Sequence, residues 1–324
     1  MTYDPILTIL ITTYNRAIVL DAVLAMLGSY QEKGLAFNIL VSDDNSTDDT
    51  NSICKRWDNT LKGFTHIKTG RNLGMDNNFI NVYEHFQTPY CWLLGDTRHI
   101  SFESLQRVLD ILSSAQYDAL ILRCRQEMPQ ERIEYSDINT LMSQQGWHIT
   151  NNASCIIPRK FINSQLYHRH IGTTFLHMGI FVENLCMMEN FRVLYMGDVD
   201  ITELEVFGFI KTGWIKHPFL NFGKLWYEFV MSLPNQISVD IKHKVLLDHN
   251  RFTKIFALSD VHRRILTYRE TYIESYCENR RFMPFVTTEP LWMYDVLIRV
   301  IPLSFYEAIF AIYKALLKKE NTPK

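Results

Sequence analysis

Short apolar runs alternate with longer segments of helical periodicity over the first 125 residues of the chain. The runs that predict strands, because they are short and rich in β-branched or other apolar residues, are Leu7–Thr12, Phe37–Ser42, Phe64–Lys68, Tyr90–Leu94 and Ala119–Cys124. Between them, apolar residues recur at the spacing of amphipathic helices. Strands that alternate with helices indicate βαβ units, so the pattern predicts an α/β fold with a mostly parallel sheet flanked by helices.

Turn residues mark the expected ends of these helices. The first helix is predicted to run through Leu27, with Gly28 near its end. The next two are expected to end near Asp58 and Phe86, and a fourth is expected over residues 101–114. The helices therefore fill the gaps between the predicted strands.

The pattern loosens after residue 125. Gln126–Tyr135 is polar and is predicted to be a loop, whereas Asn151–Arg159 is typical of a strand that enters a turn. Residues 171–230 give mixed signals, and the last third of the chain is mainly helical in pattern. We therefore expect one domain over residues 1–225, with halves at about 1–125 and 126–225, and a helical C-terminal region over 226–324.

The C-terminal region is predicted to end in an amphipathic helix over residues 302–319. Its narrow polar stripe consists of Glu307, Lys314 and Lys318. The broad apolar face comprises Phe305, Tyr306, Ile309, Phe310, Ile312, Tyr313, Leu316 and Leu317. This face suits a helix that lies on a membrane surface, and it suits equally a helix that closes the core or forms a dimer interface.

Composition narrows the class of protein. Hydrophobic residues make up 47% and charged residues 21% of the 324 residues, which is typical of a folded globular protein. A formal net charge of -2 gives no general attraction to nucleic acid. The six cysteines form no Cys-x-x-Cys pair, and neither a signal peptide nor a long apolar span is recognisable. These features predict a cytoplasmic protein with free thiols.

Polar residues gather where the first four predicted strands end. The clusters are Thr13–Arg16, Asp43–Asp48, Arg71–Asn72 and Asp96–His99. Because ligands bind at the carboxyl ends of parallel strands, we expect the four clusters to converge on one edge of the sheet. Any single cluster is also explained as a turn with a helix cap, and this applies most strongly to residues 46–48.

The residue types in these clusters suit a nucleotide. A carboxylate at a strand end accepts the imide N–H of uracil, hydrogen-bonds a ribose, or holds a divalent cation. Arg71 suits a base or a phosphate, and the ring of Tyr14 suits stacking against a base. Neither a Gly-x-x-x-x-Gly-Lys-Ser/Thr loop nor a Gly-x-Gly-x-x-Gly motif occurs, so P-loop and dinucleotide-binding proteins are disfavoured.

Four motifs in order resemble the family 2 glycosyltransferases of GT-A fold, within the subgroup that builds bacterial surface polysaccharides and includes abequosyltransferase-like enzymes. The motifs are Ile9–Arg16, Val41–Asp48, Asn72–Gly74 with Asn77 and Asn78, and Trp92–Asp96. The resemblance covers about residues 5–125 in order and spacing. It implies a glycosyltransferase that moves a sugar from a nucleoside diphosphate donor to a glycan or lipid-linked acceptor in O-antigen or capsule synthesis, with inversion, at the inner face of the plasma membrane.

The resemblance also implies roles for individual residues. Thr13 and Tyr14, followed by Arg16, match the first nucleotide-binding turn of the family. The acids Asp43 and Asp44 match a pair of which one binds the base or the ribose. In the loop after the third strand, Arg71 and Asn72 match residues that touch the nucleotide. Asp96 matches the start of the acidic motif that contacts the ribose and carries a Mg²⁺ or Mn²⁺ ion.

The acidic motif departs from the family at its end. A related pattern reads Gly-Asp-Asp-Asp, whereas this chain reads Gly95-Asp96-Thr97-Arg98. A guanidinium does not ligate Mg²⁺ or Mn²⁺, but it binds phosphate oxygens. One hypothesis is that Arg98, with His99, replaces the metal in neutralising the diphosphate. The alternatives are that Asp96 still holds a metal, or that Arg98 faces solvent or pairs with Asp96 in an impaired enzyme.

The general base is less clearly marked. Related enzymes carry an acid in a Glu-Asp motif on the acceptor side, and no clean Glu-Asp pair occurs here. His177 is the first candidate because an unperturbed histidine has a pKa near neutrality, and Glu183 is the second. Asp198 and Asp200 are further candidates, and Asp96 belongs to the same catalytic set. A core histidine and a helix-surface charge are the plain alternatives for the first two.

Aromatic residues concentrate in residues 207–229, where Trp214, Phe219, Phe222, Trp226 and Tyr227 suit either a sugar or lipid ligand or a hydrophobic core. Two other functions compete with sugar transfer. The broken acidic motif favours a catalytically impaired nucleotide-sugar-binding or scaffold protein of the same fold. A nucleotidyltransferase is disfavoured because a glycine- and Arg/Lys-rich phosphate loop is missing near the first strand.

Overall fold

The computed structural model describes residues 4–204, 216–302 and 304–308. Internal contacts divide the chain into two compact units. The first comprises Met1–Ile210 and Leu233–Ile241, and the second comprises Lys211–Ser232 and Lys242–Lys324. The domain boundary at residue 225 stays a prediction from the sequence, and the described residues 216–232 are grouped with the second unit.

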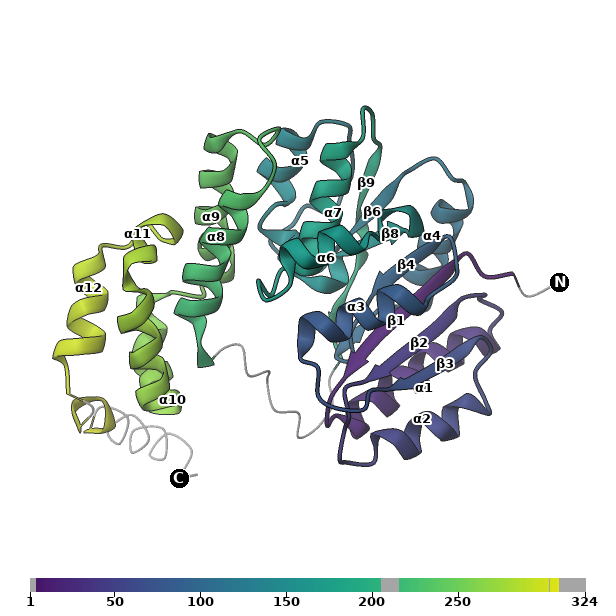
Figure 1. Cartoon of the computed structure of the whole chain (residues 1–324), viewed down its shortest axis with the longest axis horizontal. Helices are drawn as coiled ribbons and strands as arrows, with labels where there is room; N and C mark the ends of the chain where they lie inside the picture. Colours follow the sequence, from purple (N-terminus) through teal and green to yellow (C-terminus); the bar gives the residue numbers. More distant parts are fainter. Residues whose placement is uncertain (1–3, 205–215, 303, 309–324) are drawn as a thin grey trace, which may run out of the picture. The chain divides into compact units, whose positions relative to one another are not determined.

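The first unit is built on an 8-stranded sheet in the order β3-β2-β1-β4-β8-β6-β9-β7 (Figure 1). The strands are β1 (Leu7–Thr13), β2 (Asn38–Asp43), β3 (Phe64–Lys68), β4 (Tyr90–Leu93), β6 (Ala119–Arg123), β7 (Arg132–Tyr135), β8 (Cys155–Pro158) and β9 (Val193–Asp200). β1 pairs in parallel with β2 and β4, and β2 pairs in parallel with β3. β8 runs antiparallel to both β4 and β6, so the mostly parallel α/β sheet of the prediction is confirmed with a mixed half.

Helices cover the sheet of this unit (Figure 1). They are α1 (Ala17–Glu32), α2 (Thr50–Asp58), α3 (Met75–His85), α4 (Phe102–Ser113), α5 (Ile138–Gln145), α6 (Ser164–His170) and α7 (Leu176–Met187). Ser101 caps α4 by accepting a hydrogen bond from the Ser104 amide, which explains why that helix begins there. The sheet and its helices bury one continuous apolar core.

Gly28 lies inside α1 instead of at its end, because it serves helix packing. The helix continues to Glu32. A Cβ atom at Gly28 would lie 3.0 Å from Leu61 and 3.3 Å from the ring of Trp57. The missing side chain therefore lets α1 approach the α2–β3 segment closely.

The predicted loop over residues 126–135 contains a strand. β7 forms the edge of the sheet and pairs antiparallel with β9. It is short, and its exposed Arg132 and Glu134 alternate with half-buried Ile133 and buried Tyr135, so the apolar signal is too brief to stand out from a loop. Gly197 of β9 allows the chain to pass, because a Cβ there would lie 2.4 Å from the carbonyl oxygen of Glu131.

The second unit is helical, as predicted for the C-terminal region. Its described elements include η5 (Phe219–Leu225), α8 (Trp226–Ser232), most of α9 (Val239–Thr253), α10 (Leu258–Asn279), α11 (Met283–Val286), α12 (Leu291–Asp295) and η7 (Val296–Val300). Phe219 packs against Phe256, Tyr272 and Tyr276 with ring centroids 5.0–5.4 Å apart.

The aromatic segment of residues 207–229 contributes to this core. Phe219 and Trp226 are fully buried, and Phe222 stacks on His249. The core interpretation therefore holds for the described part of the segment, and Trp214 lies outside the described residues.

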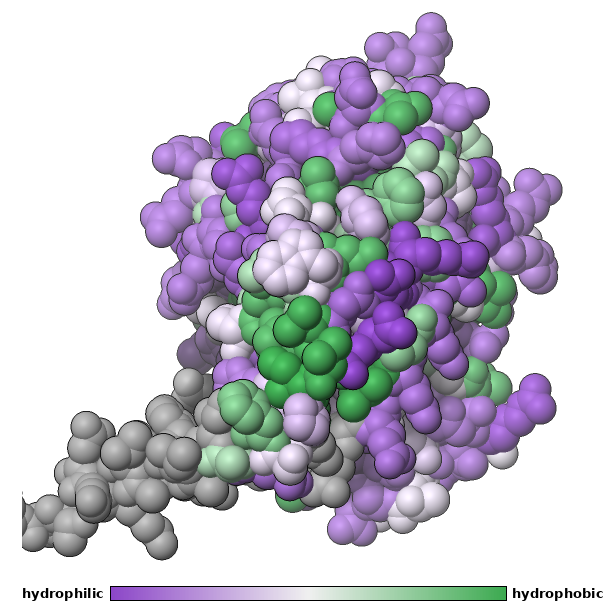
Figure 2. Space-filling model, turned by 90° about the vertical axis from the view of Figure 1, so that its left-hand side faces the viewer, coloured by the Kyte–Doolittle hydropathy of each residue, from purple (hydrophilic) through white to green (hydrophobic). Residues whose placement is uncertain are grey.

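An apolar patch covers one face of the second unit (Figure 2). Its exposed members are Phe285, Trp292, Val296, Val300 and Phe305. Most of the predicted terminal helix lies outside the described residues, of which 304–308 are helical. Within the described chain, no helix is both long enough and apolar enough to cross a membrane.

Candidate functional site

The four polar clusters converge on one edge of the sheet, as the sequence predicts. Thr13 of β1 is in register with Asp43 of β2, which is in register with Lys68 of β3. The clusters are also tied together by hydrogen bonds. The side-chain oxygen of Asn15 accepts a hydrogen bond from the backbone amide of Thr47. The backbone amide of Asn15 donates to Ser46 Oγ. The segments that follow the carboxyl ends of β1 and β2 are therefore held together by side-chain hydrogen bonds.

Asp96 connects the end of β4 to the end of β1. Its Oδ2 accepts a hydrogen bond of 2.9 Å from the Thr13 hydroxyl, and its Oδ1 lies 2.8 Å from a guanidinium nitrogen of Arg16. The carboxylate is buried, and burial raises its pKa while Arg16 opposes that rise. The predicted donor-site residues Thr13, Arg16 and Asp96 are thus joined by hydrogen bonds, with Thr13 and Asp96 buried and Arg16 half-buried.

Asp44 organises the loop that follows β3. Its Oδ1 accepts from the amide of Leu73 at 2.6 Å, and its Oδ2 accepts from the amide of Gly74 at 3.0 Å. Asn72 also accepts a bond from the Gly74 amide through its side chain. Both oxygens of Asp44 therefore serve the loop that carries Arg71, whose side chain is exposed.

Asp43 uses only one of its two carboxylate oxygens for hydrogen bonds among the described residues. Its Oδ1 accepts from the Ser46 amide at 2.8 Å. Its Oδ2 is buried and has no hydrogen-bond partner among the described residues, while Lys68 Nζ lies 4.0 Å away. A buried acceptor without a donor is costly, so this oxygen is suited to a donor group from a bound molecule. Tyr14, at the neighbouring strand end, is 45% exposed.

The helix-cap interpretation holds for part of residues 46–48. Asp48 accepts hydrogen bonds from the amide of Ala17 at the start of α1 and from the amide of Thr50 at the start of α2. These bonds hold two helix N-termini with one carboxylate. Asp48 therefore has a structural role beside the site.

Arg98 does not pair with Asp96. It lies on β5 (Arg98–His99), which pairs antiparallel with β10 (Thr202–Glu203), and its guanidinium lies 4.0 Å from Glu203. The ion pair with Asp96 is made by Arg16 instead. The alternative in which Arg98 pairs with Asp96 is therefore not the arrangement of the structure, in which Arg98 lies beside Glu203.

The residues after β4 do not fit a divalent metal. Both oxygens of Asp96 already bind Thr13 and Arg16, and the positions that follow are Thr97 and Arg98. Mg²⁺ and Mn²⁺ require several oxygen ligands, and two guanidinium groups nearby oppose another cation. Among the described residues, no three His, Cys, Asp or Glu side chains are grouped as metal ligands.

The candidate bases lie in the acceptor half, where their neighbours differ. His177, on α7, donates from Nε2 to the carbonyl of Thr150 at 3.1 Å, and burial lowers its pKa to about 4. Glu183, on the same helix, is buried and pairs with His170 at 2.6 Å and Arg169 at 3.0 Å. It is therefore not the helix-surface charge that its sequence allows.

The two aspartates of β9 are engaged in ion pairs. Asp198 pairs with Arg132 at 2.7 Å, and Asp200 pairs with Arg123 at 3.1 Å. The pKa of Asp198 is lowered by its hydrogen bonds from Arg132. Asp198 is thus held as a charged partner of the edge strand.

Sequence reasoning missed Asp76, on the first turn of α3. Its Oδ2 accepts from the amides of Gly172 at 2.7 Å and Thr174 at 3.3 Å, in the loop between α6 and α7. A polar residue shortly after the Asn72–Gly74 motif was the available signal.

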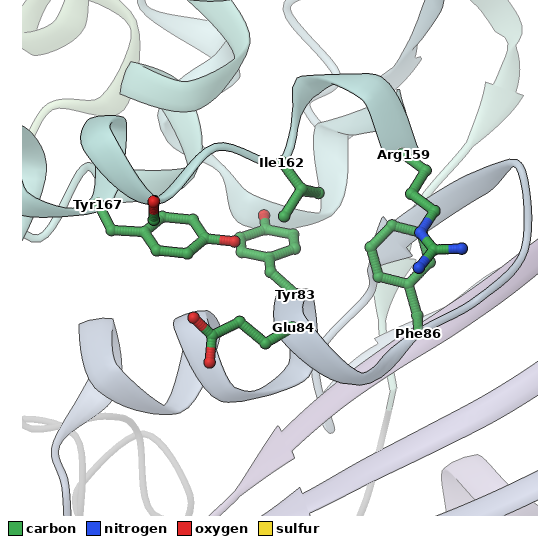
Figure 3. Close-up of a pocket in the computed structure, with 7 residues that line it drawn as sticks. Tyr83, Glu84, Phe86, Arg159, Ile162 and Tyr167 are labelled. Carbon is green, nitrogen blue, oxygen red and sulfur yellow. The ribbon is translucent and has the colours of Figure 1, made fainter.

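A pocket of about 320 Å³ lies away from these residues (Figure 3). Its lining includes Tyr83, Phe86, Arg159 and Tyr167. The amide of Arg159 donates to Pro89, just before β4 begins, so the pocket lies toward the opposite edge of the sheet. No predicted site residue lines it.

Comparisons with known proteins identify the family. The model of glycosyl transferase family 2 matches residues 8–182. The abequosyltransferase RfbV of Salmonella typhimurium is 30% identical over 105 residues, which are 32% of this chain and 32% of that protein. The match thus spans about a third of the length of that curated relative.

Solved structures share the fold. Residues 1–349 of S. aureus TarS match with a TM-score of 0.55 and 14% identity, covering 86% of this chain and 83% of that one. The same fragment in complex with UDP-GlcNAc matches with a TM-score of 0.55. The mannosyltransferase PcManGT from Pyrobaculum calidifontis, in complex with GDP-Man and Mn²⁺, has a TM-score of 0.52 and 15% identity, covering 92% of this chain and 87% of that one.

The Arg16–Asp96 pair yields a stability prediction. Arg16→Ala removes the cation beside a buried carboxylate and should lower the free energy of unfolding by about 2 kcal/mol at neutral pH. Because burial raises the pKa of Asp96, this loss should shrink at acidic pH, where Asp96 takes up a proton in both proteins. Urea unfolding at the two pH values measures the effect.

Arg16→Lys is the control, because it retains the positive charge. Its loss should be smaller than that of the alanine variant at neutral pH. An equal loss for Arg16→Ala at both pH values would contradict an electrostatic role of the pair.

Proposed function

The chain belongs to glycosyl transferase family 2 and is a glycosyltransferase, and we propose that it transfers a sugar from a nucleoside diphosphate donor to a glycan or lipid-linked acceptor. We propose further that the product is a bacterial surface polysaccharide such as O-antigen or capsule, made on the cytoplasmic side of the membrane. The similarity to a Salmonella abequosyltransferase supports this product class. The observation that carries the proposal is the joined set of strand-end clusters at one sheet edge.

The donor nucleotide is proposed to bind across the ends of β1–β3. Asp43 Oδ2, buried and without a partner among the described residues, accepts an N–H of the base. The exposed ring of Tyr14 stacks on the base, and Arg71 with Asn72 contacts the nucleotide from the loop after β3. Asp44 serves this step indirectly, because it holds that loop through two backbone amides.

The diphosphate is proposed to be neutralised by arginine. Arg98 lies three residues beyond Gly95 and is opposed only loosely by the largely exposed Glu203, 4.0 Å away. Its planar guanidinium makes two parallel hydrogen bonds to phosphate oxygens, which stabilises the charge that grows on the leaving group. Arg98 on β5 thus supplies positive charge for the diphosphate, as Arg16 supplies it for Asp96.

The reaction is proposed to invert the anomeric carbon. An acceptor hydroxyl oxygen forms a bond to that carbon while the bond to the diphosphate oxygen breaks, and a general base takes the hydroxyl proton. His177 and Glu183 are the candidates from the sequence. Burial keeps His177 neutral but lowers its pKa to about 4, which makes it a weaker base than an ordinary histidine. The ion pairs of Glu183 with Arg169 and His170 disfavour the second candidate.

A membrane surface is proposed to hold the lipid-linked acceptor near the enzyme. Trp292, Val296 and Val300 are spaced four residues apart, and all are exposed on the apolar patch (Figure 2). The patch leads along the chain into the predicted amphipathic helix with its terminal lysines. An aromatic and aliphatic surface followed by basic residues suits an interface with anionic lipid.

A nucleotide-sugar-binding protein without transfer activity is the second candidate. The observation that favours it is the engagement of both Asp96 oxygens by Thr13 and Arg16. Donor turnover, measured with and without an acceptor extract, separates this candidate from the enzyme.

Binding of the donor depends on Asp43 in this proposal. UDP-, GDP-, CDP- and dTDP-sugars are tested by thermal shift, and one base class should raise the melting temperature of the wild type. Asp43→Asn should weaken that response about tenfold or more, because the amide replaces an acceptor for the base N–H. Asp110→Asn, at an exposed site on α4, is the control and should bind normally. Unchanged affinity in Asp43→Asn would remove Asp43 from the base site.

Turnover is expected to persist in EDTA. Arg98→Ala should lower kcat about 100-fold, because a group that stabilises the leaving charge is lost, while Arg98→Lys should retain part of the activity. Arg107→Ala, on the half-exposed surface of α4, provides the control. Activity that disappears in EDTA and returns with Mn²⁺ would contradict neutralisation by arginine alone.

Membrane contact is tested by flotation with vesicles that contain anionic lipid. The full chain should float with the vesicles, whereas a chain ending at Ile301 and the Trp292→Glu variant should float less. Ile18→Glu changes an equally exposed apolar residue on α1 and should have no effect. Equal flotation of all four proteins would exclude the patch and the terminal segment as the contact.

A further inference from the structure

Asp76 lies where the donor-side loop meets the acceptor half of the first unit. It follows Gly74 by two residues, and the Gly74 amide is bound by Asp44 of the donor site. Its own carboxylate reaches Gly172 and Thr174, in the loop between α6 and α7. One short segment thus links the carboxyl end of β2 to the start of α7.

The contact holds the α6–α7 loop in an uncommon conformation. Gly172 has a φ of 82° and Thr174 has a φ of 69°, and a β-branched residue rarely adopts such a positive φ. Two hydrogen bonds to Asp76 Oδ2 offset that cost. Asp76 therefore fixes the loop from which α7 begins.

The second carboxylate oxygen of Asp76 does not contribute to holding this loop. Oδ1 is buried without a hydrogen-bond partner among the described residues, and the whole residue is only 8% exposed. The glycines on either side leave room nearby, because a Cβ atom at Gly74 or at Gly172 would meet no atom within 4 Å. A buried carboxylate oxygen without a donor is costly, so Oδ1 is suited to a hydroxyl group of a bound molecule.

Burial and charge prepare this carboxyl group for proton transfer. Desolvation raises the pKa of Asp76, and the two backbone amides together with the charge of His170 oppose the rise. His170, on α6, is itself bonded to Glu183 of α7. A carboxylate with a raised pKa is a stronger base than an ordinary aspartate.

We propose that Asp76 is the general base of sugar transfer, an inference that rests on the proposed function. Oδ1 of Asp76 takes the proton of the acceptor hydroxyl as the acceptor oxygen bonds to the anomeric carbon. The bond from that carbon to the diphosphate oxygen breaks at the same time, and its electron pair leaves with the nucleoside diphosphate. The carboxylate that α3 provides thereby takes the place of a Glu-Asp pair on the acceptor side.

The test is Asp76→Asn, which keeps an oxygen that accepts from Gly172 and Thr174 but cannot take a proton. We expect kcat to fall by about 10²–10⁴-fold, with the donor affinity and the melting temperature near those of the wild type. The wild-type kcat should decline at acidic pH as Asp76 is protonated, and the residual activity of the variant should lack that decline. Asp110→Asn is the matched control on α4, and His177→Ala and Glu183→Gln are measured beside it.

Each outcome decides between the roles. Near wild-type kcat in Asp76→Asn, or a collapse confined to His177→Ala, would overturn the inference. If Asp76→Asn loses both its fold and its donor affinity, Asp76→Glu, which keeps a carboxyl group, is measured in its place. If Asp76→Glu folds, a decline of kcat at acidic pH, over the same pH range as in the wild type, supports the inference. The absence of that decline overturns the inference. A wild-type protein that neither binds nor turns over any donor would instead overturn the proposed function.

Discussion

The sheet edge at the carboxyl ends of β1–β4, where the donor is proposed to bind, depends on the contacts of the buried Asp96 carboxylate. Parallel strands bring their carboxyl ends to the same edge, but they do not by themselves align the loops that follow. Asp96 joins the end of β4 to Thr13 and Arg16 at the end of β1. Desolvation of the acid makes the pairing obligatory, since a buried charge without a partner is strongly destabilising. The same pairing uses the oxygens that a metal would require.

Four buried aspartates divide the work at this edge. Asp44 and Asp96 use both oxygens to hold protein groups, whereas Asp43 and Asp76 each keep one oxygen without a partner among the described residues. Fully bonded carboxylates provide rigidity, and incompletely bonded ones provide capacity for a ligand. This division assigns Asp43 to the nucleotide and Asp76 to the acceptor in our proposals. The acids are compensated by backbone amides and by Arg16 and Lys68.

Much of the first 125 residues was predictable because their burial is periodic. β1, β2, β4 and β6 are nearly continuous apolar runs, as expected for strands covered on both faces, and the polar residues that follow β1, β2 and β4 mark the site. Prediction failed where burial is partial or where the reason is tertiary. β7 has a mostly exposed edge, and Gly28 lies within α1 because α1 packs closely on the segment that follows. Neither feature has a local signature in sequence.

By itself the sequence determined the mostly parallel α/β sheet, the convergence of four polar clusters and the family. Alternation of apolar runs with helices and the motif spacing are enough for these. Only the tertiary structure decided which groups meet: Arg16 rather than Arg98 pairs with Asp96, Glu183 is buried in ion pairs, and Asp76 reaches a loop almost a hundred positions away in the chain. Such partners are chosen by long-range packing and desolvation, which depend on three-dimensional distance and leave no period along the chain.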